Sequence, residues 1–530
     1  MKGKFPDGLL GRLVVSFILL LTGLQLAHAQ YVRKNHFASE QARRQVYDLD
    51  DWIAYAPSHH FTSVTVGSNY IYFATDGGGI WRYHLYENFW DFPFTTSNGL
   101  PSNRVSKVLY DGERNILWAF TDKDVAIYRF AEREWYWKSQ SNFYYNPPQS
   151  PEPPEGKEIA PNVFYPREYL NRLPLYFVNG DYTLTGEWKV MDDNFDEYPV
   201  VGFLRDEWER FWFLIEGLGV AVGSPYSQRM DIMTLGLPEI ETRAMAFQGN
   251  DLWVGGLPLY EDMGQSAIVR WRDDSGLWDY YYARRNSYLH SDWVYDIAAN
   301  QNTVWFATNY GVSRLKGREW KTYTQSEGLY NLQVNDLLLH GNELYIGTVN
   351  GLNRLVLSTD SLFREKDEVV HLATIYQLSA QGDTIWAATN RGILRKLPGG
   401  SWKSVIPGAS ATDMPTTAVE AVKGEVWFAS PGGVFSLNTR NGNWESYPQI
   451  GMELDGPFMD LEVLPGAVWV STPSGLLKFD RKRYYWQLFT EEDGLINNRC
   501  YKLLLDGDYI WVATAGGLCQ FYWNKPFRID

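Results

Sequence analysis

The chain has 530 residues, a formal net charge of −15 at pH 7, 16% aromatic residues and 46 Gly. A chain this acidic repels phosphate backbones, which argues against a nucleic-acid or anionic-lipid partner. Abundant aromatic residues and glycines are typical of many short strands joined by tight turns.

Residues 1–29 predict a secretory signal peptide. A basic start leads into an apolar run over residues 13–24, which is too short for a comfortable membrane span, and Ala27-His28-Ala29 provides a small-x-small cleavage pattern. We therefore expect cleavage near Ala29 and a periplasmic or secreted protein, with no membrane span in the mature chain. An uncleaved anchor is the alternative.

A repeat of about forty-two residues follows a lead-in over residues 30–50 and extends over residues 51–530. Its core is an aromatic residue followed by a hydroxyl residue three positions later and by Gly three positions after that. The clear copies have their aromatic residue at Tyr72, Trp305, Tyr345, Trp386, Trp427, Trp469 and Trp511, and weaker copies are centred on Trp118, Trp212 and Trp253.

Each repeat has the pattern of four short strands, and a period near forty with four strands is typical of a β-propeller. The sequence thus predicts an all-β protein, a propeller of about ten four-stranded blades. Residues 51–55 resemble an isolated fourth strand, while the last repeat supplies only three strands. An N-terminal strand that completes the last blade would close one ring. Two smaller propellers are the alternative, because ten blades exceed the usual four to eight.

The array is interrupted between Trp118 and Trp212 by a Pro-rich insertion at about residues 140–185. This stretch is interpreted as a flexible insertion with an extra hairpin. A degenerate additional blade is the alternative.

The segments before two first strands, residues 99–105 (GLPSNRV) and 494–499 (GLINNR), carry a family resemblance. Together with the W-x-x-T-x-x-G pattern they resemble the two-component regulator propeller repeat, which forms the periplasmic sensor region of hybrid histidine kinases. The resemblance covers nearly all of the chain after residue 29. It implies an extracytoplasmic propeller that binds a ligand, often a polysaccharide fragment, and that works with a signalling or envelope protein.

This chain departs from the kinase pattern, because no transmembrane, kinase or response-regulator segment follows its repeats. Standalone relatives include a propeller protein of the bacterial type IX secretion machinery. A structural scaffold of an envelope or secretion assembly is therefore the alternative to a sensing or binding function.

No catalytic, metal or cofactor motif stands out in the sequence. The repeated Thr occurs once per blade, whereas a nucleophile occurs once per active site. His59 and His60 are adjacent, and neighbours on a strand point to opposite faces. We therefore expect a protein that is not an enzyme and needs no cofactor or metal. An enzyme is the third hypothesis.

Most of the 23 Trp residues fall at repeated packing positions. Six lie outside the repeat register and are candidates for ligand contact: Trp81, Trp137, Trp208, Trp271, Trp293 and Trp523. Propeller ligands usually bind at one mouth of the central channel, where the turn after the second strand meets the loop before the first strand. The candidates in those loops are Trp293, His290, Asp292, Tyr310, Arg104, Arg391 and Arg499. Trp293 beside His290 is the first choice, and ordinary solvated loop residues are the alternative for each.

Cys500 and Cys519 fall on the first and third strands of one predicted blade. The intervening strand places them about 10 Å apart, beyond disulfide reach. We expect two buried thiols.

Overall fold

The computed structural model describes residues 32–141, 146–148, 156–160, 163–166, 177–178, 182–185, 189–224, 226–259, 266–405, 414–454 and 456–528. The predicted signal peptide and much of the Pro-rich insertion lie outside these residues. Within them, no helix is both long and apolar enough to span a bilayer.

Ten antiparallel sheets dominate the structure and confirm an all-β propeller fold. The first three are β3–β6 (Phe61–Val66, Tyr70–Thr75, Ile80–His84, Phe89–Phe94), β7–β10 (Val105–Asp111, Ile116–Thr121, Val125–Arg129, Glu134–Trp137) and β16–β19 (Glu197–Arg205, Phe211–Ile215, Gly219–Ser224, Arg229–Thr234). The next three are β20–β23 (Ile240–Gln248, Asp251–Pro258, Ile268–Trp271, Trp278–Tyr281), β24–β27 (Val294–Ala299, Thr303–Thr308, Gly311–Lys316, Glu319–Tyr323) and β28–β31 (Val334–His340, Glu343–Thr348, Gly351–Val356, Ser361–Arg364).

The remaining four sheets complete the array. They are β32–β35 (Ile375–Gln381, Thr384–Thr389, Gly392–Lys396, Trp402–Val405), β36–β39 (Ala418–Val422, Glu425–Ser430, Gly433–Asn438, Trp444–Tyr447), β40–β43 (Asp460–Val463, Ala467–Thr472, Gly475–Asp480, Tyr485–Phe489) and β44–β46 (Cys500–Asp506, Tyr509–Thr514, Gly517–Tyr522). Two short α-helices, α2 (Glu40–Arg44) and α3 (Pro448–Glu453), and the 3-10 turns η1 (Thr96–Asn98) and η3 (Ala283–Arg285) accompany them.

The repeated Thr and Gly build the turn between the second and third strands. Thr308 Oγ1 accepts a hydrogen bond from the Tyr310 N–H at 3.0 Å and donates one to the Gly311 carbonyl at 2.9 Å. Gly311 has φ 98°, and a Cβ there would lie 2.1 Å from the Tyr323 carbonyl oxygen. Both residues of the motif are therefore required by the fold.

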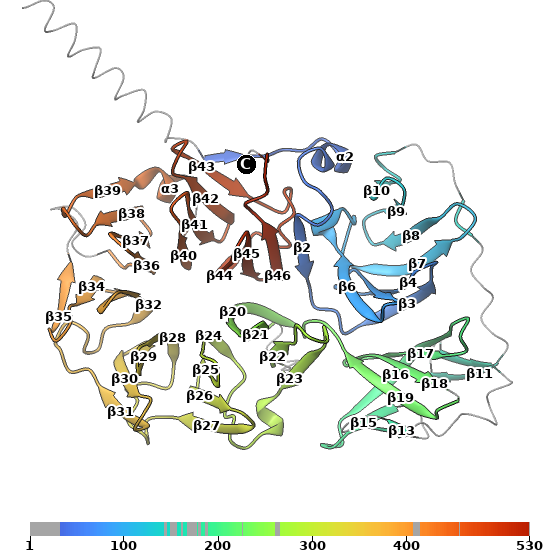
Figure 1. The fold of residues 1–530 in the computed structure, drawn as a ribbon, viewed down its shortest axis with the longest axis horizontal. Coiled ribbons are helices and arrows are strands. Elements are labelled where there is room, and N and C mark those ends of the chain that lie inside the picture. The colour runs from blue at the N-terminus through green and yellow to red at the C-terminus, as the bar shows by residue number, and fades with distance from the viewer. Residues whose placement is uncertain are drawn as a thin grey trace, which may run out of the picture.

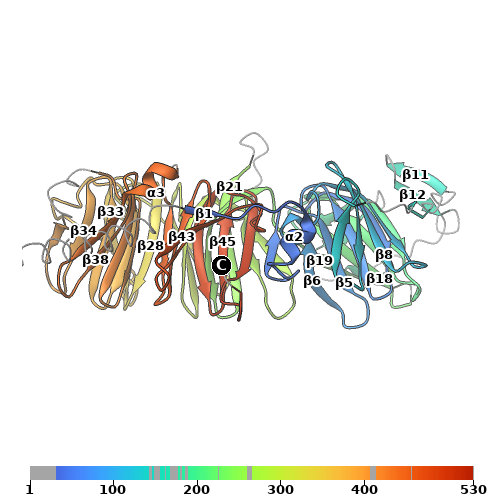
Figure 2. The same cartoon turned by 90° about the horizontal axis from the view of Figure 1, so that it is seen from above.

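Seven of the sheets form a closed ring. Their inner strands pack in the order β20, β24, β28, β32, β36, β40 and β44, and β44 packs against β20 again. The other three sheets form an arc beside this ring, with inner strands in the order β16, β3 and β7. Figures 1 and 2 show ring and arc side by side in one flat layer. The sequence predicted a single ring of about ten blades. The structure instead has a ring of seven sheets and an arc of three, because the inner strand β20 packs directly against β44.

The arc is an insertion into the ring. The chain passes from β2 (Trp52–Tyr55) through the arc and returns at β20. Its two connections meet, because Pro57 and Leu237 form a parallel bridge and the Ser58 N–H donates to the Leu237 carbonyl at 3.1 Å. Adjacent ends are what allow a folded unit to be inserted into another without opening it.

The N-terminal segment closes the ring, as predicted from residues 51–55. β2 pairs antiparallel with β46, and the Trp52 ring stacks on Phe521 with 3.9 Å between ring centroids. The preceding strand β1 (Val32–Lys34) pairs parallel with β43 in the neighbouring blade. One short segment therefore completes two adjacent blades and covers their sheet edges.

The described part of the Pro-rich insertion adds strands to the arc. β11 (Gly156–Ala160) and β12 (Val163–Pro166) form a separate hairpin, visible at one end of Figure 2. β14 (Tyr182–Leu184) and β15 (Lys189–Asp192) extend the sheet of β16, and β13 (Phe177–Val178) runs parallel to β19. β13, β14 and β15 thus enlarge one sheet while β11 and β12 stand apart from it, and the described part of the insertion makes no further blade.

An aromatic cluster joins the arc to the ring. Tyr55 lies with its ring centroid 6.0 Å from Trp81 of the arc, 5.9 Å from Trp271 and 5.8 Å from Trp278 of the ring. Trp81 is 2% exposed, and Trp271 packs against the same core. These two tryptophans, which lie outside the repeat register, therefore pack the joint between arc and ring.

The two cysteines are buried and unpaired, as predicted. Cys500 lies on β44 and Cys519 on β46, with β45 between them. Burial raises the pKa of both thiols, which keeps them in the unreactive protonated form.

We expect Trp52→Ala to lower the stability of the ring by about 3–5 kcal/mol, the usual cost of truncating a buried Trp. The reason is that Trp52 is 1% exposed and its stacking on Phe521 fixes the closing strand. Thermal unfolding and limited proteolysis measure the loss. Tyr288→Ala, at a side chain that is 68% exposed, is the matched control. Equal melting temperatures for both variants would contradict closure by β2.

A second prediction concerns the connection between arc and ring at His60. Its Nδ1 contacts Glu216 of the arc, and its Nε2 lies 2.8 Å from Glu239 Oε1 at the start of the ring. The hydrogen bond to Glu216 raises the pKa of His60 to about 9. A raised pKa stabilises the fold fully below the ordinary value of about 6.5, and the gain is lost as the pH rises through about 9.

We therefore expect His60→Gln to lower the melting temperature at pH 6 and to leave it close to the unmodified protein at pH 10. Melting curves across this pH range test the expectation. A difference between the two proteins that stays constant with pH would show that the ion pairs contribute nothing.

Candidate ligand-binding site

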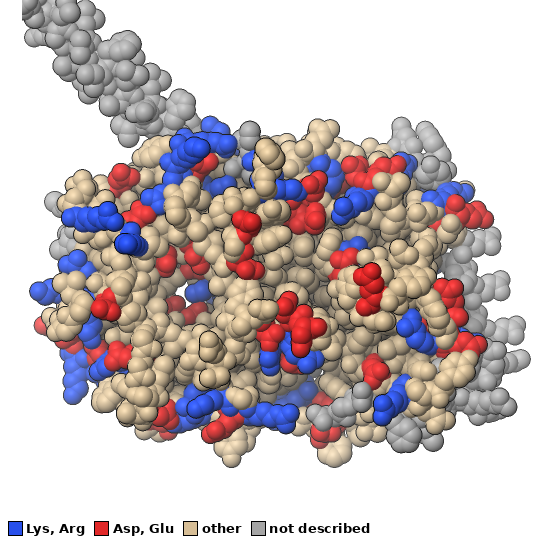
Figure 3. All heavy atoms as spheres, viewed as in Figure 1, with Lys and Arg blue, Asp and Glu red and all other residues tan. Residues whose placement is uncertain are grey.

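Bulged residues line one mouth of the ring's central channel. Five inner strands shift register near their start and leave one extra residue each: Arg243, Tyr295, Asn335, Tyr376 and Tyr501. All five line a cavity of about 360 Å³ at the channel mouth. Figure 3 shows an opening at the centre of the ring, bordered by acidic and basic side chains. We call this cavity the channel mouth.

A layer of polar side chains below the mouth joins neighbouring blades. In each case a carboxylate or amide oxygen on one inner strand accepts the backbone N–H of the next inner strand. The pairs are Asp296 with Leu337 at 2.9 Å, Asp336 with Leu378 at 2.8 Å, Gln377 with Val419 at 2.8 Å and Asp460 with Leu503 at 2.8 Å. These buried polar groups are satisfied and hold the ring together.

Among the residues that line the cavity, Lys502 is the positively charged residue that lies in the polar layer, next in the chain after the bulged Tyr501. Its Nζ lies 3.1 Å from Asp296 Oδ1. Burial disfavours the ammonium form, but the carboxylates of Asp296, Asp460 and Asp336 outweigh burial and raise the pKa of Lys502. Burial, together with the charge of Asp296, raises the pKa of Asp336 well above its usual range.

Two glutamates lie one step deeper in the channel. Glu420 and Glu462 are two residues beyond Ala418 and Asp460 on their strands, so they share the channel-facing side. Burial raises the pKa of Glu420 to about 7, and burial followed by the charge of Asp460 raises the pKa of Glu462. The channel therefore carries more carboxylates than cations. Such a site repels anionic ligands, while its tyrosines offer flat apolar faces and hydroxyl groups.

The structure brings together two of the residues predicted for the site. The rings of His290 and Tyr310 pack edge to face at 5.4 Å between centroids, and both side chains are exposed. Trp293 is half-buried and forms a strand-like bridge with Gly256. Asp292 accepts the Ala283 N–H at 2.9 Å, and burial raises the pKa of its carboxyl group.

The three predicted arginines lie apart from this group and from one another. Arg104 belongs to the arc, where its Nε lies 3.8 Å from Asp76. Arg391 donates to the Glu368 carbonyl at 3.3 Å in another blade. Arg499 reaches the channel mouth through Glu241, whose Oε1 is 3.9 Å from the Arg499 guanidinium. Glu241 also pairs with Arg243 at 2.8 Å and accepts from the Tyr501 hydroxyl.

The bulged residues at the mouth were absent from the sequence prediction, although a signal for them exists. Each clear case stands between an apolar residue and a polar channel residue, as in Val294-Tyr295-Asp296, Val334-Asn335-Asp336, Ile375-Tyr376-Gln377 and Cys500-Tyr501-Lys502. An alternating strand should not place two consecutive polar or aromatic residues on its buried side. Because the alternation breaks at the same place in successive repeats, it indicates a β-bulge, in which one extra residue of the strand has no partner on the neighbouring strand.

Sequence comparison gives no family model that matches the chain and no curated protein that matches it. Several solved structures resemble its fold. The extracellular domain of the proposed hybrid two-component system BT4673 from B. thetaiotaomicron is 13% identical with a TM-score of 0.46, over 89% of this chain and 71% of that chain. Virginiamycin B lyase from Staphylococcus aureus is 12% identical with a TM-score of 0.41, over 53% of this chain and 94% of that chain.

A third structure is PorZ, a surface component of the type-IX secretion system of Porphyromonas gingivalis. It is 12% identical with a TM-score of 0.32, over 89% of this chain and 87% of that chain. Extracellular domains of hybrid two-component systems are thus among the solved structures whose fold this chain resembles.

We expect Lys502→Met to destabilise the ring by up to about 3–5 kcal/mol near pH 8, because it leaves buried carboxylates without their cation. The loss shrinks toward pH 5, where carboxyl groups with raised pKa values take up protons and need no cation. Melting curves at both pH values measure it. Lys403→Met, at an exposed lysine, is the control. A loss that is the same at both pH values would contradict this account of the channel.

Proposed function

We propose that this chain is a non-catalytic, extracytoplasmic binding or sensing propeller whose ligand enters the ring at the channel mouth. One observation carries the proposal. Five bulges deliver Arg243, Tyr295, Asn335, Tyr376 and Tyr501 to a single cavity. Asn335 donates to the Ile375 carbonyl at 2.9 Å, and Arg243 and Tyr501 contact Glu241, so these bonds hold the mouth in shape. The faces of the tyrosine rings are the groups that we propose for recognition.

Carbohydrate is the ligand class that we favour for this cavity. Tyrosine rings provide flat apolar faces for sugar rings, and Asn335, Arg243 and the hydroxyl groups of the mouth provide hydrogen bonds in both directions. The excess of carboxylates below the mouth disfavours acidic sugars. We therefore propose neutral or amino sugars. The predicted signal peptide and the resemblance to periplasmic sensor propellers support an extracytoplasmic location.

A scaffold in an envelope or secretion assembly is the second candidate, and one surface feature favours it. Tyr86, Trp208 and Tyr226 of the arc are 59%, 41% and 78% exposed, and the Tyr86 and Trp208 rings pack edge to face at 5.5 Å. Exposed aromatic groups of this kind are typical of protein contact surfaces.

A thermal-shift screen against neutral, amino and acidic oligosaccharides tests the proposal. A ligand at a hundred times its dissociation constant stabilises the folded state by about 2.7 kcal/mol, which raises the melting temperature. We expect neutral or amino sugars to give a dose-dependent rise and acidic sugars to give none. Tyr376→Ala should weaken binding at least about tenfold, equivalent to about 1.4 kcal/mol.

Two further variants locate the site. Tyr288→Ala removes an exposed tyrosine away from the cavity lining and should bind like the unmodified protein. Trp293→Ala tests the loop site predicted from the sequence. If Trp293→Ala loses binding while Tyr376→Ala binds fully, the ligand binds at that loop and not at the channel mouth. No shift with any sugar, together with capture of an envelope protein that Trp208→Ala abolishes, would favour the scaffold.

A further inference from the structure

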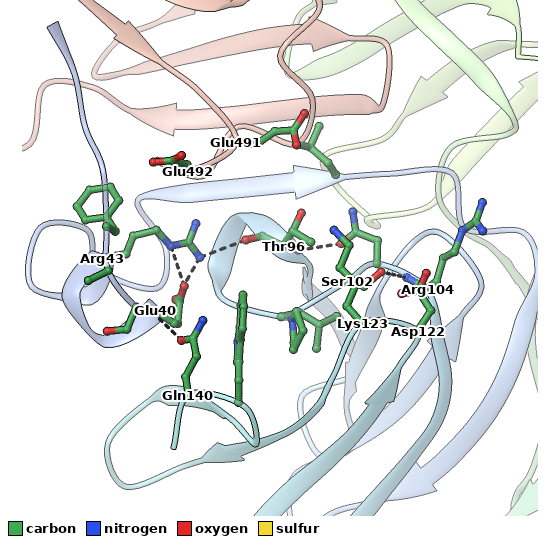
Figure 4. A pocket seen from close by; sticks show the side chains of 18 of the residues that line it. Glu40, Arg43, Thr96, Ser102, Arg104, Asp122, Lys123, Gln140, Glu491 and Glu492 are labelled. Atoms are coloured by element: carbon green, nitrogen blue, oxygen red, sulfur yellow. Dashed lines mark hydrogen bonds and ion pairs between the residues drawn. The ribbon is translucent and has the colours of Figure 1, made fainter. Parts of the chain in front are cut away.

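A second cavity lies between three parts of the chain that are distant in sequence. Its walls come from residues 37–43 of the N-terminal segment, from loops of the arc at residues 96–104, 122–123 and 137–140, and from the ring loop at residues 491–496. Its volume is about 530 Å³, within the range of about 300–1,000 Å³ of small-molecule sites. Figure 4 shows it from close by. We call it the junction pocket.

One wall of the junction pocket is held rigidly by a buried ion pair. Arg43 Nε lies 2.9 Å from Glu40 Oε2, and both side chains are less than a tenth exposed. The Arg43 guanidinium also donates to the carbonyls of Thr96 and Ser97 at 3.1 Å each. Because the donors of Arg43 and the carboxylate of Glu40 are occupied by these contacts, both residues shape the pocket and leave recognition to others.

The floor of the junction pocket is apolar and fixed. Leu100, Pro101 and Ile496 are buried there, and Phe37 is half-buried beside them. Trp137 is anchored by a hydrogen bond from its Nε1–H to the Gly99 carbonyl at 2.7 Å. Trp137 is one of the tryptophans outside the repeat register, and it is the one that lines this cavity. The hydrogen bond fixes the aromatic ring beside aliphatic side chains, and together they form a surface on which an apolar side chain of a ligand can pack.

The basic groups of the rim lie across the pocket from two glutamates. Glu491 and Glu492 come from the ring loop, and Figure 4 shows them across the pocket from Arg104 and Lys123 of the arc. Asp122 lies on the arc side as well, and its N–H donates to the Arg104 carbonyl at 3.3 Å. The Arg104 side chain is 66% exposed, and its Nε lies 3.8 Å from Asp76, so two cations and Asp122 leave this side of the rim with a positive charge.

The acidic side also keeps free acceptor capacity. Glu491 uses one carboxylate oxygen to accept the Asn498 N–H at 3.2 Å. Glu492 contacts His36 Nδ1 at 3.0 Å on the exposed surface. A carboxylate has about four acceptor positions, so both groups can accept further hydrogen bonds.

We propose that the junction pocket binds a short peptide with free ends, independently of the channel mouth. The peptide carboxylate pairs with Arg104 and Lys123, its ammonium group pairs with Glu491 and Glu492, and an apolar side chain packs on Trp137. A polyanion would meet the two glutamates, and a polycation would meet the arginine and the lysine, so like-charge repulsion selects a ligand with opposite charges at its two ends.

Equilibrium dialysis of the chain from residue 30 onward against two pools of synthetic tripeptides tests this proposal. One pool has free ends, and the other has the same sequences with acetylated and amidated ends. Mass spectrometry of both compartments gives the bound fraction. We expect retention of free-ended peptides with an aromatic or aliphatic residue and at least tenfold weaker retention of their blocked counterparts.

Matched variants separate the junction pocket from other sites. The double variant Arg104→Ala, Lys123→Ala should lose at least tenfold in retention, whereas Arg104→Lys, Lys123→Arg should keep most of it. Arg104 and Lys123 are both exposed, so we expect neither double variant to change the melting curve, and an unchanged curve verifies that the variant is folded. Tyr376→Ala should retain peptides fully, which makes failure at the channel mouth distinguishable from failure here. No retention of free-ended peptides, equal retention of blocked ones, or full retention by the double alanine variant would each overturn the proposal.

Discussion

The pairing of β2 with β46 is the constraint on which the rest of the structure depends. A ring of seven sheets has a central channel only while its first and last blades stay in contact, as β20 and β44 do. β2 completes the last blade with Trp52 stacked on Phe521, and Tyr55 at its end contacts Trp271 and Trp278 of the first ring blade. The same segment continues directly into the arc, and Tyr55 at its end packs among tryptophans of both units. Ring closure and attachment of the arc are therefore one event, made by a few consecutive residues.

In five of the seven inner strands of the ring, one extra residue reaches the mouth beside a residue that joins the blades. Asp336 joins the blades through the Leu378 N–H, and the bulged Asn335 before it lines the mouth and donates to the Ile375 carbonyl at 2.9 Å. The bonds of the polar layer are made by the residues in register, so they do not depend on which side chain the bulge carries. Lys502 completes the arrangement, since without a cation the buried aspartates would repel each other.

Sequence periodicity was sufficient for the fold but not for its division into ring and arc. The Thr-x-x-Gly turn has a local cause, visible at Thr308 and Gly311, so it repeats wherever a blade exists and reveals each one. The point of closure depends on which inner strands meet, and the blades of arc and ring have the same local pattern. Likewise, Trp81 lies outside the repeat because it packs the joint, a contact with residues far away in the chain. Tryptophans were chosen as ligand candidates because they lie outside the repeat register, and this choice mixed residues of the joint with pocket residues such as Trp137. The bulged tyrosines were missed because they recur at the same position of successive repeats.

The place of the closing strand ahead of the blades has a consequence for the order of folding. β2 is synthesised before the arc and before the sheets of the ring, whereas its partner β46 follows them, so the strand waits until the other blades have been produced. The arc lies entirely between them and has its own packed sheets, so it can fold while the ring is still open. Such long-range pairing is intrinsically slow and leaves sheet edges exposed in the meantime. During this interval the uncovered outer strand of the last blade is an edge that other strands can pair with.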